Sequence, residues 1–213
     1  ASGRGMLTTR TWDRLNRLGS IHSQAHISST SLGLGLGHTY TYNAANQRTR
    51  ADLADGSYWV YEYDKLGQVI SGRRYWGDGT LMAGQDFTYQ FDDIGNRDTT
   101  GGRASAVSDY SANQLNQYET RTVPNKLDIL GVANPTQPVE VWKESDSPST
   151  ASRSGEYFHY ALTVAYSSYP EVFAKSLFAP NQQASAGRSF VPPAIEDFDH
   201  DLDGNLIKDG RWT

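Results

Sequence analysis

The sequence predicts a mainly β protein, in which an antiparallel repeat sheet is joined by a smaller inserted β domain. A short phrase recurs at intervals of about twenty to thirty residues, which is typical of a repeat architecture. The chain has 13 tyrosines and 12% aromatic residues, a composition that favours strands with half-buried faces. Asp-Gly pairs at 55–56 and 78–79 are a strong short-range hairpin signal.

The recurring phrase is clearest at residues 61–69. Tyr61 and Tyr63 lie two apart and therefore point to the same face of a strand. Asp64 follows, and its carboxylate can accept hydrogen bonds from the backbone N–H groups ahead of it. Gly67 supplies the positive φ that such a turn requires, and Val69 begins the return strand. The repeating unit is therefore strand, turn, strand.

The copies align on the residue that opens the turn. These residues are Asp13, Asn43, Asp64, Asp92 and Asp201. Strands are expected over 32–42, 49–53, 57–63, 69–76, 87–91 and 96–100. We expect a loop at 101–108, and a short helix or a turn within 110–122, where the sequence is polar around Leu115 and Tyr118.

The segment Tyr63-Asp64-Lys65-Leu66-Gly67-Gln68-Val69 resembles the tyrosine–aspartate (YD) repeat of bacterial Rhs proteins and of their animal relatives, the teneurins. The resemblance covers residues 6–122 and 197–213. It implies a β-sheet that spirals into a hollow shell, often around a C-terminal toxin. It also implies a secreted or cell-surface bacterial protein, with the remainder of the parent Rhs chain or its toxin cargo as partner. The family's self-cleavage aspartates match no segment of this chain.

The composition changes near residue 120. All 8 prolines follow this point, and most of the 20 glycines precede it, which indicates a boundary. Residues 139–142, 155–166 and 171–178 are strand-like, whereas 143–154 is expected to be an exposed loop. The predicted organisation is therefore a repeat sheet at 1–122, an inserted and sandwich-like β domain at 123–196, and a resumed repeat at 197–213.

Charge and hydropathy exclude several classes of function. A net charge of −5 argues against nucleic-acid binding, because phosphates need a basic surface. The mean hydropathy of −0.62 and the absence of a long apolar run exclude a membrane-spanning helix. The chain has no cysteine, so disulfides and thiolate metal sites are excluded.

An alternation of acids near the end of the chain suits calcium. Asp199, Asp201, Asp203 and Gly204 form an Asp-x-Asp-x-Asp-Gly run, and carboxylates at this spacing can surround a hard cation. The twelfth position, however, is Gly210 where an EF-hand loop needs glutamate, and no flanking helix is predicted. The alternative is an acid-rich turn of the repeat. No other cofactor is expected.

A dense aromatic set marks the best-preserved repeats. Its members are Tyr58, Trp59, Tyr61, Tyr75 and Trp76. Exposed rings on a rigid sheet can bind glycans by stacking on sugar faces. The alternative is cross-strand aromatic pairing, which stabilises a sheet by about 0.2–1 kcal/mol per pair.

No catalytic motif accompanies these features. The chain lacks a Gly-x-Ser-x-Gly elbow and a His-Glu-x-x-His pair, and His159 lies in an aromatic strand where packing is the simpler role. We therefore predict a non-enzymatic, structural segment of an Rhs/YD-repeat shell that serves encapsulation, secretion or cell-surface contact. The alternatives are a carbohydrate-binding or adhesive module and a hydrolase acting on polysaccharide. Unpaired strand edges also predict an edge-to-edge homodimer, or a contact of the repeat sheet with the insertion.

Overall fold

The computed structural model describes residues 4–27, 30–103, 106–176 and 184–212, and all regular structure in these ranges is β-strand. The largest sheet has 11 strands in the order β1-β2-β3-β4-β5-β6-β7-β8-β9-β10-β18. The predicted mainly β class, with a large antiparallel sheet, is confirmed. By its contacts the chain divides into two compact units, residues 1–88 and 89–213, and each is described by itself below.

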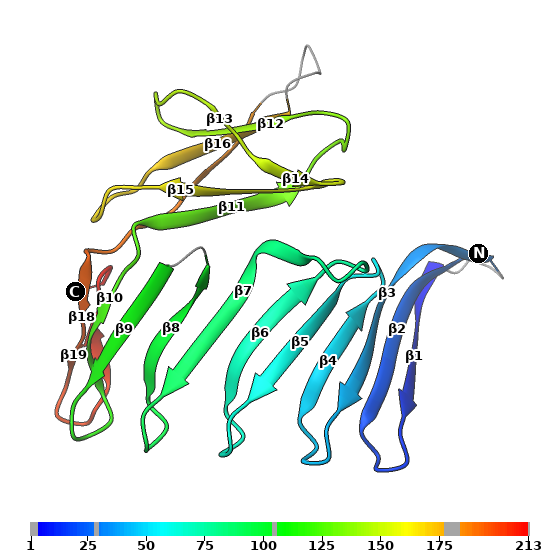
Figure 1. Ribbon diagram of the computed structural model, residues 1–213, viewed down its shortest axis with the longest axis horizontal. Helices are drawn as coiled ribbons and strands as arrows, with labels where there is room; N and C mark the ends of the chain where they lie inside the picture. Colours follow the sequence, from blue (N-terminus) through cyan, green and yellow to red (C-terminus); the bar gives the residue numbers. More distant parts are fainter. Residues whose placement is uncertain (1–3, 28–29, 104–105, 177–183, 213) are drawn as a thin grey trace. The chain divides into compact units, whose positions relative to one another are not determined.

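The first unit is a succession of antiparallel hairpins (Figure 1). Its strands are β1 (Arg4–Trp12), β2 (Leu18–Ile27), β3 (Thr30–Tyr42), β4 (Arg48–Leu53), β5 (Tyr58–Tyr63), β6 (Val69–Tyr75) and β7 (Leu81–Phe91), of which β7 continues into the second unit. Many of the pairings shift register beside a turn, for example between Thr11 and Trp12 and between Glu62 and Tyr63. Such bulges re-aim side chains at the strand ends.

The predicted strands of the first unit are confirmed, with one difference in length. β7 begins at Leu81, whereas the sequence predicted a strand from residue 87. Gly84 lies inside β7 at φ 74°, a conformation that few other residues adopt. Because this glycine interrupts the alternation of side chains along the strand, the sequence pattern did not predict the first half of β7.

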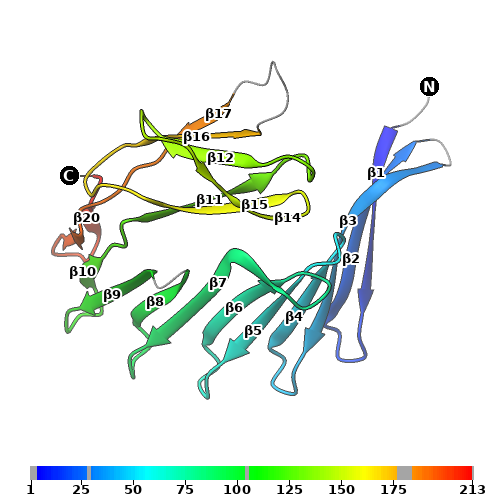
Figure 2. The ribbon, with the colours of Figure 1, turned by 45° about the horizontal axis from the view of Figure 1, so that its top comes forward.

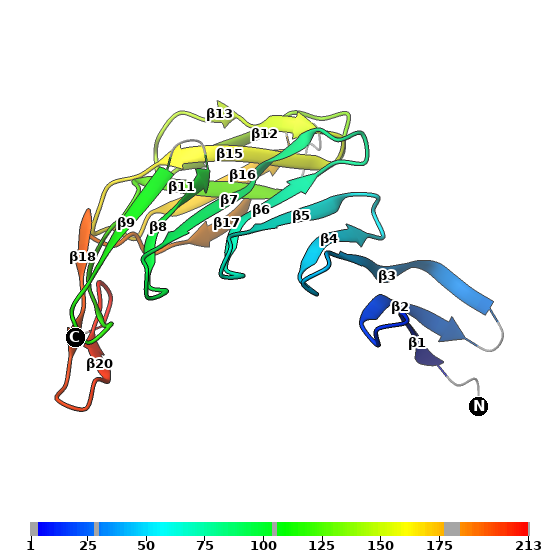
Figure 3. The same ribbon diagram turned by 60° about the horizontal axis from the view of Figure 1, so that its bottom comes forward.

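The second unit continues the hairpins and then carries a separate pair of sheets. Its repeat strands are β8 (Arg97–Arg103), β9 (Ala106–Ala112), β10 (Tyr118–Thr122) and β18 (Ile195–Asp197), followed by the hairpin β19 (Asp199–His200) and β20 (Leu206–Lys208). β18 pairs with β10 although more than seventy residues separate them in sequence. Figure 3 shows the β19–β20 hairpin after β18, at the C-terminal end of the unit.

Among the repeat strands of this unit, one sequence expectation is wrong and a second is confirmed in part. Residues 101–108 were expected to form a loop, but 101–103 belong to β8 and 106–108 to β9. Residues 110–122 were expected to form a short helix or a turn; a tight turn does lie at 113–117, but the residues on either side of it form the end of β9 and β10. The turn opens at Asn113. The residue before it is alanine, whereas the other repeats carry an aromatic residue at or near this place, so the sequence pattern did not identify this copy of the repeat.

The remaining strands of the second unit form two small sheets with a common apolar core (Figure 2). The strands are β11 (Lys126–Val132), β12 (Val139–Lys143), β13 (Ser149–Thr150), β14 (Ser152–Ser154), β15 (Tyr157–Thr163), β16 (Glu171–Ser176) and β17 (Ser185–Arg188). One sheet has the order β11-β15-β14 and the other β13-β12-β16-β17. The exposed loop expected at 143–154 is confirmed for residues 144–148, which are exposed and lie between β12 and β13. It is wrong for 149–154, where β13 and β14 flank Ala151, which is buried.

The core of these two sheets explains their alternating sequences. Val139 and Val141 of β12 face Phe158 and Leu162 of β15 in one buried cluster. The intervening residues point outward, and there Trp142 stacks on Phe173 with ring centroids 5.4 Å apart. In the described ranges, no helix is both long and apolar enough to cross a membrane.

Candidate functional site

The repeat turns share one hydrogen-bonding geometry. At Asp64, Oδ1 accepts hydrogen bonds from the backbone N–H groups of Leu66 and Gln68, both at 2.9 Å. The N–H of Asp64 donates to the carbonyl of Gln68, and the N–H of Gly67 donates to the carbonyl of Asp64. Gly67 has φ 87°, so one side chain and one left-handed residue close the turn, as the sequence predicted.

The same set of bonds occurs at six positions. The residues that open these turns are Asp13, Asn43, Asp64, Asp92, Asn113 and Asp201. The residue three positions later always has positive φ and is glycine or asparagine, the residues that adopt this conformation at least cost. Asparagine replaces aspartate because only the side-chain oxygen is needed as the acceptor.

Two further turns of the first unit use a different cap. The turns at 53–57 and 76–80 have the same main-chain bonds, with Gly56 and Gly79 at positive φ. Here the acceptor is the third residue: Asp55 Oδ1 binds the N–H of Ser57 at 2.9 Å, and Asp78 Oδ1 binds that of Thr80 at 2.8 Å. In the first unit these turns lie at the strand ends opposite to the turns of Asn43 and Asp64 (Figure 1).

Two of the turn carboxylates, those of Asp13 and Asp201, are stabilised in their charged form. The backbone N–H of Arg17 lowers the pKa of Asp13, helped by the Arg17 side chain. The side-chain amide and backbone N–H of Asn205 lower the pKa of Asp201 in the same way. Both groups are therefore ionised, hydrogen-bonded structural acids, and neither has the raised pKa that a general acid would need.

Adjacent repeats are linked through the aromatic residue before the turn. Tyr42 donates its hydroxyl hydrogen to the carbonyl of Leu18 at 3.0 Å, and Tyr63 donates to that of Arg48 at 2.6 Å. Each accepting carbonyl belongs to the residue five positions after the one that opens the preceding turn: Leu18 follows Asp13, and Arg48 follows Asn43. The Arg17 guanidinium also stands 4.7 Å from the centroid of the Tyr42 ring, within range of a cation–π interaction. The tyrosine of the phrase thus fixes the register between repeats.

The predicted aromatic set does not form one platform. Tyr58 and Tyr75 are cross-strand partners, with ring centroids 5.4 Å apart. Trp59 lies on the opposite face of β5, since side chains alternate along a strand, and it stacks on Tyr61 at 6.2 Å and on Phe87 at 6.0 Å. Trp76 opens the turn at 76–80. The rings lie against one another, and a role of this set in glycan binding stays a prediction.

Two of the three acids predicted for calcium have protein partners. Asp199 pairs with Lys208 Nζ at 3.2 Å. Asp201 accepts bonds from the backbone N–H groups of Asp203 and Asn205 and from Asn205 Nδ2, at 2.8 to 3.0 Å. A search of the described residues finds no group of three His, Asp or Glu side chains arranged to hold a metal ion. Calcium binding at Asp199, Asp201 and Asp203 stays an untested prediction.

Two hydrogen-bonded side-chain pairs that the sequence did not indicate are more enclosed. His159 Nε2 lies 2.7 Å from Asp128 Oδ1, and the side chains are 13% and 9% exposed. On the neighbouring strand, Ser152 donates its hydroxyl hydrogen to the carbonyl of His159, so its proton is engaged by the main chain instead of by the imidazole. These bonds describe a structural pair and show no activated nucleophile.

The second pair joins β10 to the end of the chain. Arg121 Nε donates to Glu196 Oε2, and the other oxygen of Glu196 accepts the N–H of Gly210 at 3.0 Å. A Cβ at position 210 would collide with the Glu196 carboxylate, so glycine is required for this approach. Only the pairing of β10 with β18 brings these residues together, and no local pattern signals it.

The comparisons with known proteins bear on the fold. No protein-family profile matches the chain, and no curated protein matches its sequence. Among solved structures, the crystal structure of TcdB2-TccC3-Cdc42 is similar over 96% of this chain, with a TM-score of 0.50 and 14% identity. The fold is therefore similar to that of one segment of TcdB2-TccC3-Cdc42. At this identity the likeness shows the fold alone.

Two further structures give lower scores. They are TcdB2-TccC3 without its hypervariable C-terminal region (TM-score 0.49, 14% identity, 98% of this chain) and the Photorhabdus luminescens Tc holotoxin pore (TM-score 0.46, 16% identity, 96% of this chain). The chain spans 11% of the length of each of the three solved chains.

Proposed function

We propose that this chain is a structural, non-enzymatic wall segment of an Rhs/YD-repeat shell. Its parent would be a secreted or cell-surface bacterial protein, and the wall would enclose a toxin cargo or contact a cell surface. The observation that carries the proposal is the turn geometry repeated at five positions along one antiparallel sheet and at a sixth in the β19–β20 hairpin. A turn of this kind can be repeated to extend a sheet by any number of hairpins, because its hydrogen bonds lie within its own hairpin.

The chemistry of the described side chains supports a structural role. The acids of the turns accept main-chain hydrogen bonds, and the arginines of β4 and β6 pair with neighbouring acids. Arg50 contacts Asp52 at 2.6 Å, and Arg73 contacts Asp86 at 2.9 Å. The pair of Arg50 and Asp52 lies within β4, whereas Arg73 and Asp86 are partners on β6 and β7, so the second pair stabilises cross-strand neighbours, which is what a wall requires.

Electron cryo-microscopy of the full-length protein that contains these residues tests the proposal. The sheet should form part of a wall around an enclosed volume, and the enclosed segments should resist added protease. Gly67→Val should weaken this resistance by straining a wall turn, whereas Ala45→Val, at the exposed tip of another turn, should leave it unchanged. A full-length protein in which the sheet encloses nothing would contradict the proposal.

A carbohydrate-binding module is the second candidate, because Trp59, Tyr61 and Phe87 gather on one sheet face. A glycan array should then give signals that Trp59→Ala removes and Trp142→Ala, in the other unit, retains. Absence of binding to any glycan would leave the structural role alone. The hydrolase hypothesis has no side-chain arrangement behind it, and a screen with chromogenic glycosides tests it.

Edge-to-edge pairing of two copies is a separate proposal about partners. β1 is the terminal strand of the large sheet, and its described neighbour is β2 alone. A free edge offers backbone donors and acceptors to another chain. Light scattering over a range of concentrations should show a growing dimer fraction, and a mass that stays monomeric would contradict it.

A further inference from the structure

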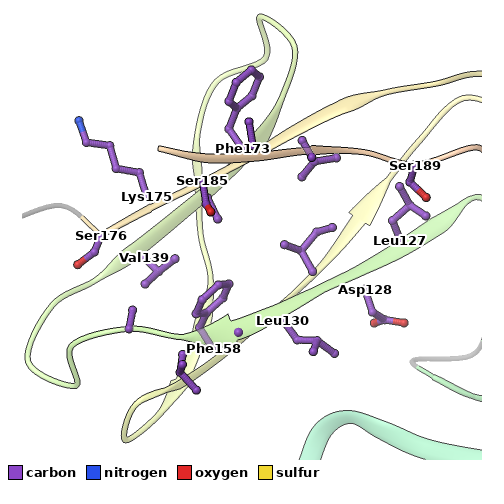
Figure 4. A pocket seen from close by; sticks show the side chains of 18 of the residues that line it. Leu127, Asp128, Leu130, Val139, Phe158, Phe173, Lys175, Ser176, Ser185 and Ser189 are labelled. Carbon is purple, nitrogen blue, oxygen red and sulfur yellow. The ribbon is translucent and has the colours of Figure 1, made fainter. Parts of the chain in front are cut away.

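Two cavities of the second unit differ in origin. The larger one, of about 700 Å³, lies between β11 on one small sheet and β16 and β17 on the other (Figure 4). Leu127 and Ile129 line it and also pack on the buried core, so it continues the apolar interface of the two sheets. The smaller one, of about 390 Å³, lies in the repeat sheet and is lined by residues of the turns at 92–96 and 113–117. The geometry of the repeat explains this smaller cavity.

Neighbouring hairpins of the repeat sheet separate near the turns. At each junction the last pair joins the residue seven positions after one turn opener to the residue four positions before the next. These pairs are Ser20 with Thr39, Arg50 with Val60, and Thr99 with Asp109. In these described strands, the residues nearer to the turns are not paired across the junction. A gap therefore lies between the strand ends, and a side chain can fill it.

A tyrosine fills this gap in the first unit. Tyr42 directly precedes the turn opener Asn43, and its hydroxyl donates to the carbonyl of Leu18 on the neighbouring hairpin. Tyr63 makes the same bond to the carbonyl of Arg48. One ring and one hydrogen bond thus close each of these two junctions.

At the junction of β8 and β9, the residue in the place of the tyrosine is Ala112. It lines the smaller cavity together with Asn96 and Arg97, which stand four and five positions after the turn opener Asp92. The methyl group of alanine cannot span a gap that a tyrosine ring spans. The cavity therefore lies where the repeat places a phenol ring in the first unit.

Tyr118 on the next strand occupies only part of this junction. It is the cross-strand partner of Ala112, and its ring centroid lies 5.3 Å from that of Tyr110. Its hydroxyl accepts the backbone N–H of Arg97 at 2.8 Å, but Tyr118 does not line the cavity. The carbonyl of Arg97 is the counterpart of the two acceptors in the first unit, and a carbonyl oxygen has two lone pairs.

We propose that the smaller cavity binds a 4-hydroxyphenyl group, supplied by a free phenol or by a tyrosine side chain of a polypeptide. The ring would lie against Ala112 and Tyr110 and would cover Ile94, which is 71% exposed. The hydroxyl would donate to the Arg97 carbonyl, as the tyrosines of the first unit donate to theirs. The volume is within the range of about 300–1,000 Å³ that is typical of small-molecule sites. This site does not depend on the wall function proposed above.

The test uses the whole 213-residue chain with N-acetyltyrosinamide, N-acetylphenylalaninamide and 4-methylphenol. Isothermal titration calorimetry should show one N-acetyltyrosinamide bound per chain. The phenylalanine analogue should bind about five- to tenfold more weakly, because it lacks one hydrogen bond. In NMR spectra the ligand should shift the amide signals of 96–98 and 110–113. Binding of 4-methylphenol alone would assign the cavity to free phenols, and binding of both hydroxyl ligands would assign it to tyrosine side chains as well.

Ala112→Tyr supplies the ring from the chain itself. It should weaken the binding of N-acetyltyrosinamide about tenfold or more and raise the unfolding temperature of the repeat sheet, because a ring and a hydrogen bond then close the junction. Ala112→Phe should block the ligand equally and raise the unfolding temperature less. Ala45→Tyr, at the exposed tip of a turn in the first unit, is the matched control and should change neither quantity.

Several outcomes would overturn the proposal. Two of them are failure of both hydroxyl ligands to bind the unmodified chain, and equal affinity for the tyrosine and phenylalanine amides. A third is amide shifts that leave 96–98 and 110–113 unaffected. These three need no variant, so they hold even where a substitution at position 112 prevents folding. Unchanged binding by a folded Ala112→Tyr variant is the fourth.

Discussion

The first unit and the pair of small sheets in the second unit are stabilised in different ways. In the small sheets, Val139, Val141, Phe158 and Leu162 belong to one buried cluster. In the described part of the first unit, the buried side chains are Ala51, Ser57, Ser71 and Met82. The small sheets therefore depend on apolar burial, at about 25 cal/mol per Å². The repeat sheet depends on capped turns and cross-strand pairs.

This difference determines how far a defect spreads. Removing a core side chain affects every element that packs on it, because protein interiors are close-packed. Removing one turn bond affects a single hairpin and its neighbours, since the stability of a repeat array is approximately a sum of local terms.

Phe158→Ala should destabilise the small sheets by about 3–5 kcal/mol, because it leaves a cavity in their core. Urea unfolding followed by Trp142 fluorescence measures this loss. Leu130→Ala, on the adjacent edge strand and 43% exposed, is the control and should cost much less. An effect of equal size in both variants would show that the cluster is not the main source of stability.

Gly67→Ala should cost about 1–2 kcal/mol in the repeat sheet, because position 67 has φ 87° and an L side chain is strained there. Hydrogen exchange should locate the loss at β5 and β6. Gly72→Ala is the matched control, since its Cβ would meet the Tyr61 ring at 3.5 Å, an ordinary contact. Loss of protection throughout the first unit would contradict the view that the turns act locally.

Tyr63→Phe should destabilise the junction of neighbouring repeats by about 0.5–1.5 kcal/mol, through loss of the hydrogen bond to the carbonyl of Arg48. Tyr61→Phe is the comparison, because the Tyr61 hydroxyl makes no hydrogen bond to the described residues. Thermal unfolding of both variants measures the difference. Equal stability of the Tyr63→Phe and Tyr61→Phe variants would contradict the view that the Tyr63 hydroxyl fixes the register between neighbouring repeats.

Acid should weaken the aspartate turns before it weakens the asparagine turns. The pKa values of Asp13 and Asp201 in the folded chain lie below the ordinary value of 3.8. Their ionised forms therefore stabilise the fold above that value, and this contribution is lost as the pH falls through the lower folded pKa. Amide exchange at pH 5 and at about pH 2.5 should show opening at 13–17 and 201–205, with 43–47 and 113–117 unchanged.

The matched variants are Asp13→Asn and Asp201→Asn, which keep the side-chain oxygen and remove the titration. The pH dependence at these two turns should then flatten, and exchange at 43–47 should not change. A pH dependence that persists in both variants would mean that other groups cause the acid weakening.

Much of the repeat sheet follows from local sequence, and the exceptions have local causes. The turn residues Asp64 and Asp92 could be assigned because their side chains bond the backbone two and four residues ahead. Asn113 was missed because Ala112 stands where the phrase has an aromatic residue, although Asn116 and Gln117 follow as in the copy at Asn43. The positive-φ asparagine was the signal that could have found it.

The sequence by itself determined the β class, the turn chemistry and the alternation of β12, because each depends on residues only a few positions apart. The tertiary structure alone decided that Tyr58 stacks on Tyr75 on one face of the sheet and that Trp59 stacks on Phe87 on the other. It also decided that Arg121 meets Glu196 and that β11 and β17 border an open groove. These features depend on which distant strands pair, and long-range pairing is set by the packing of whole strands.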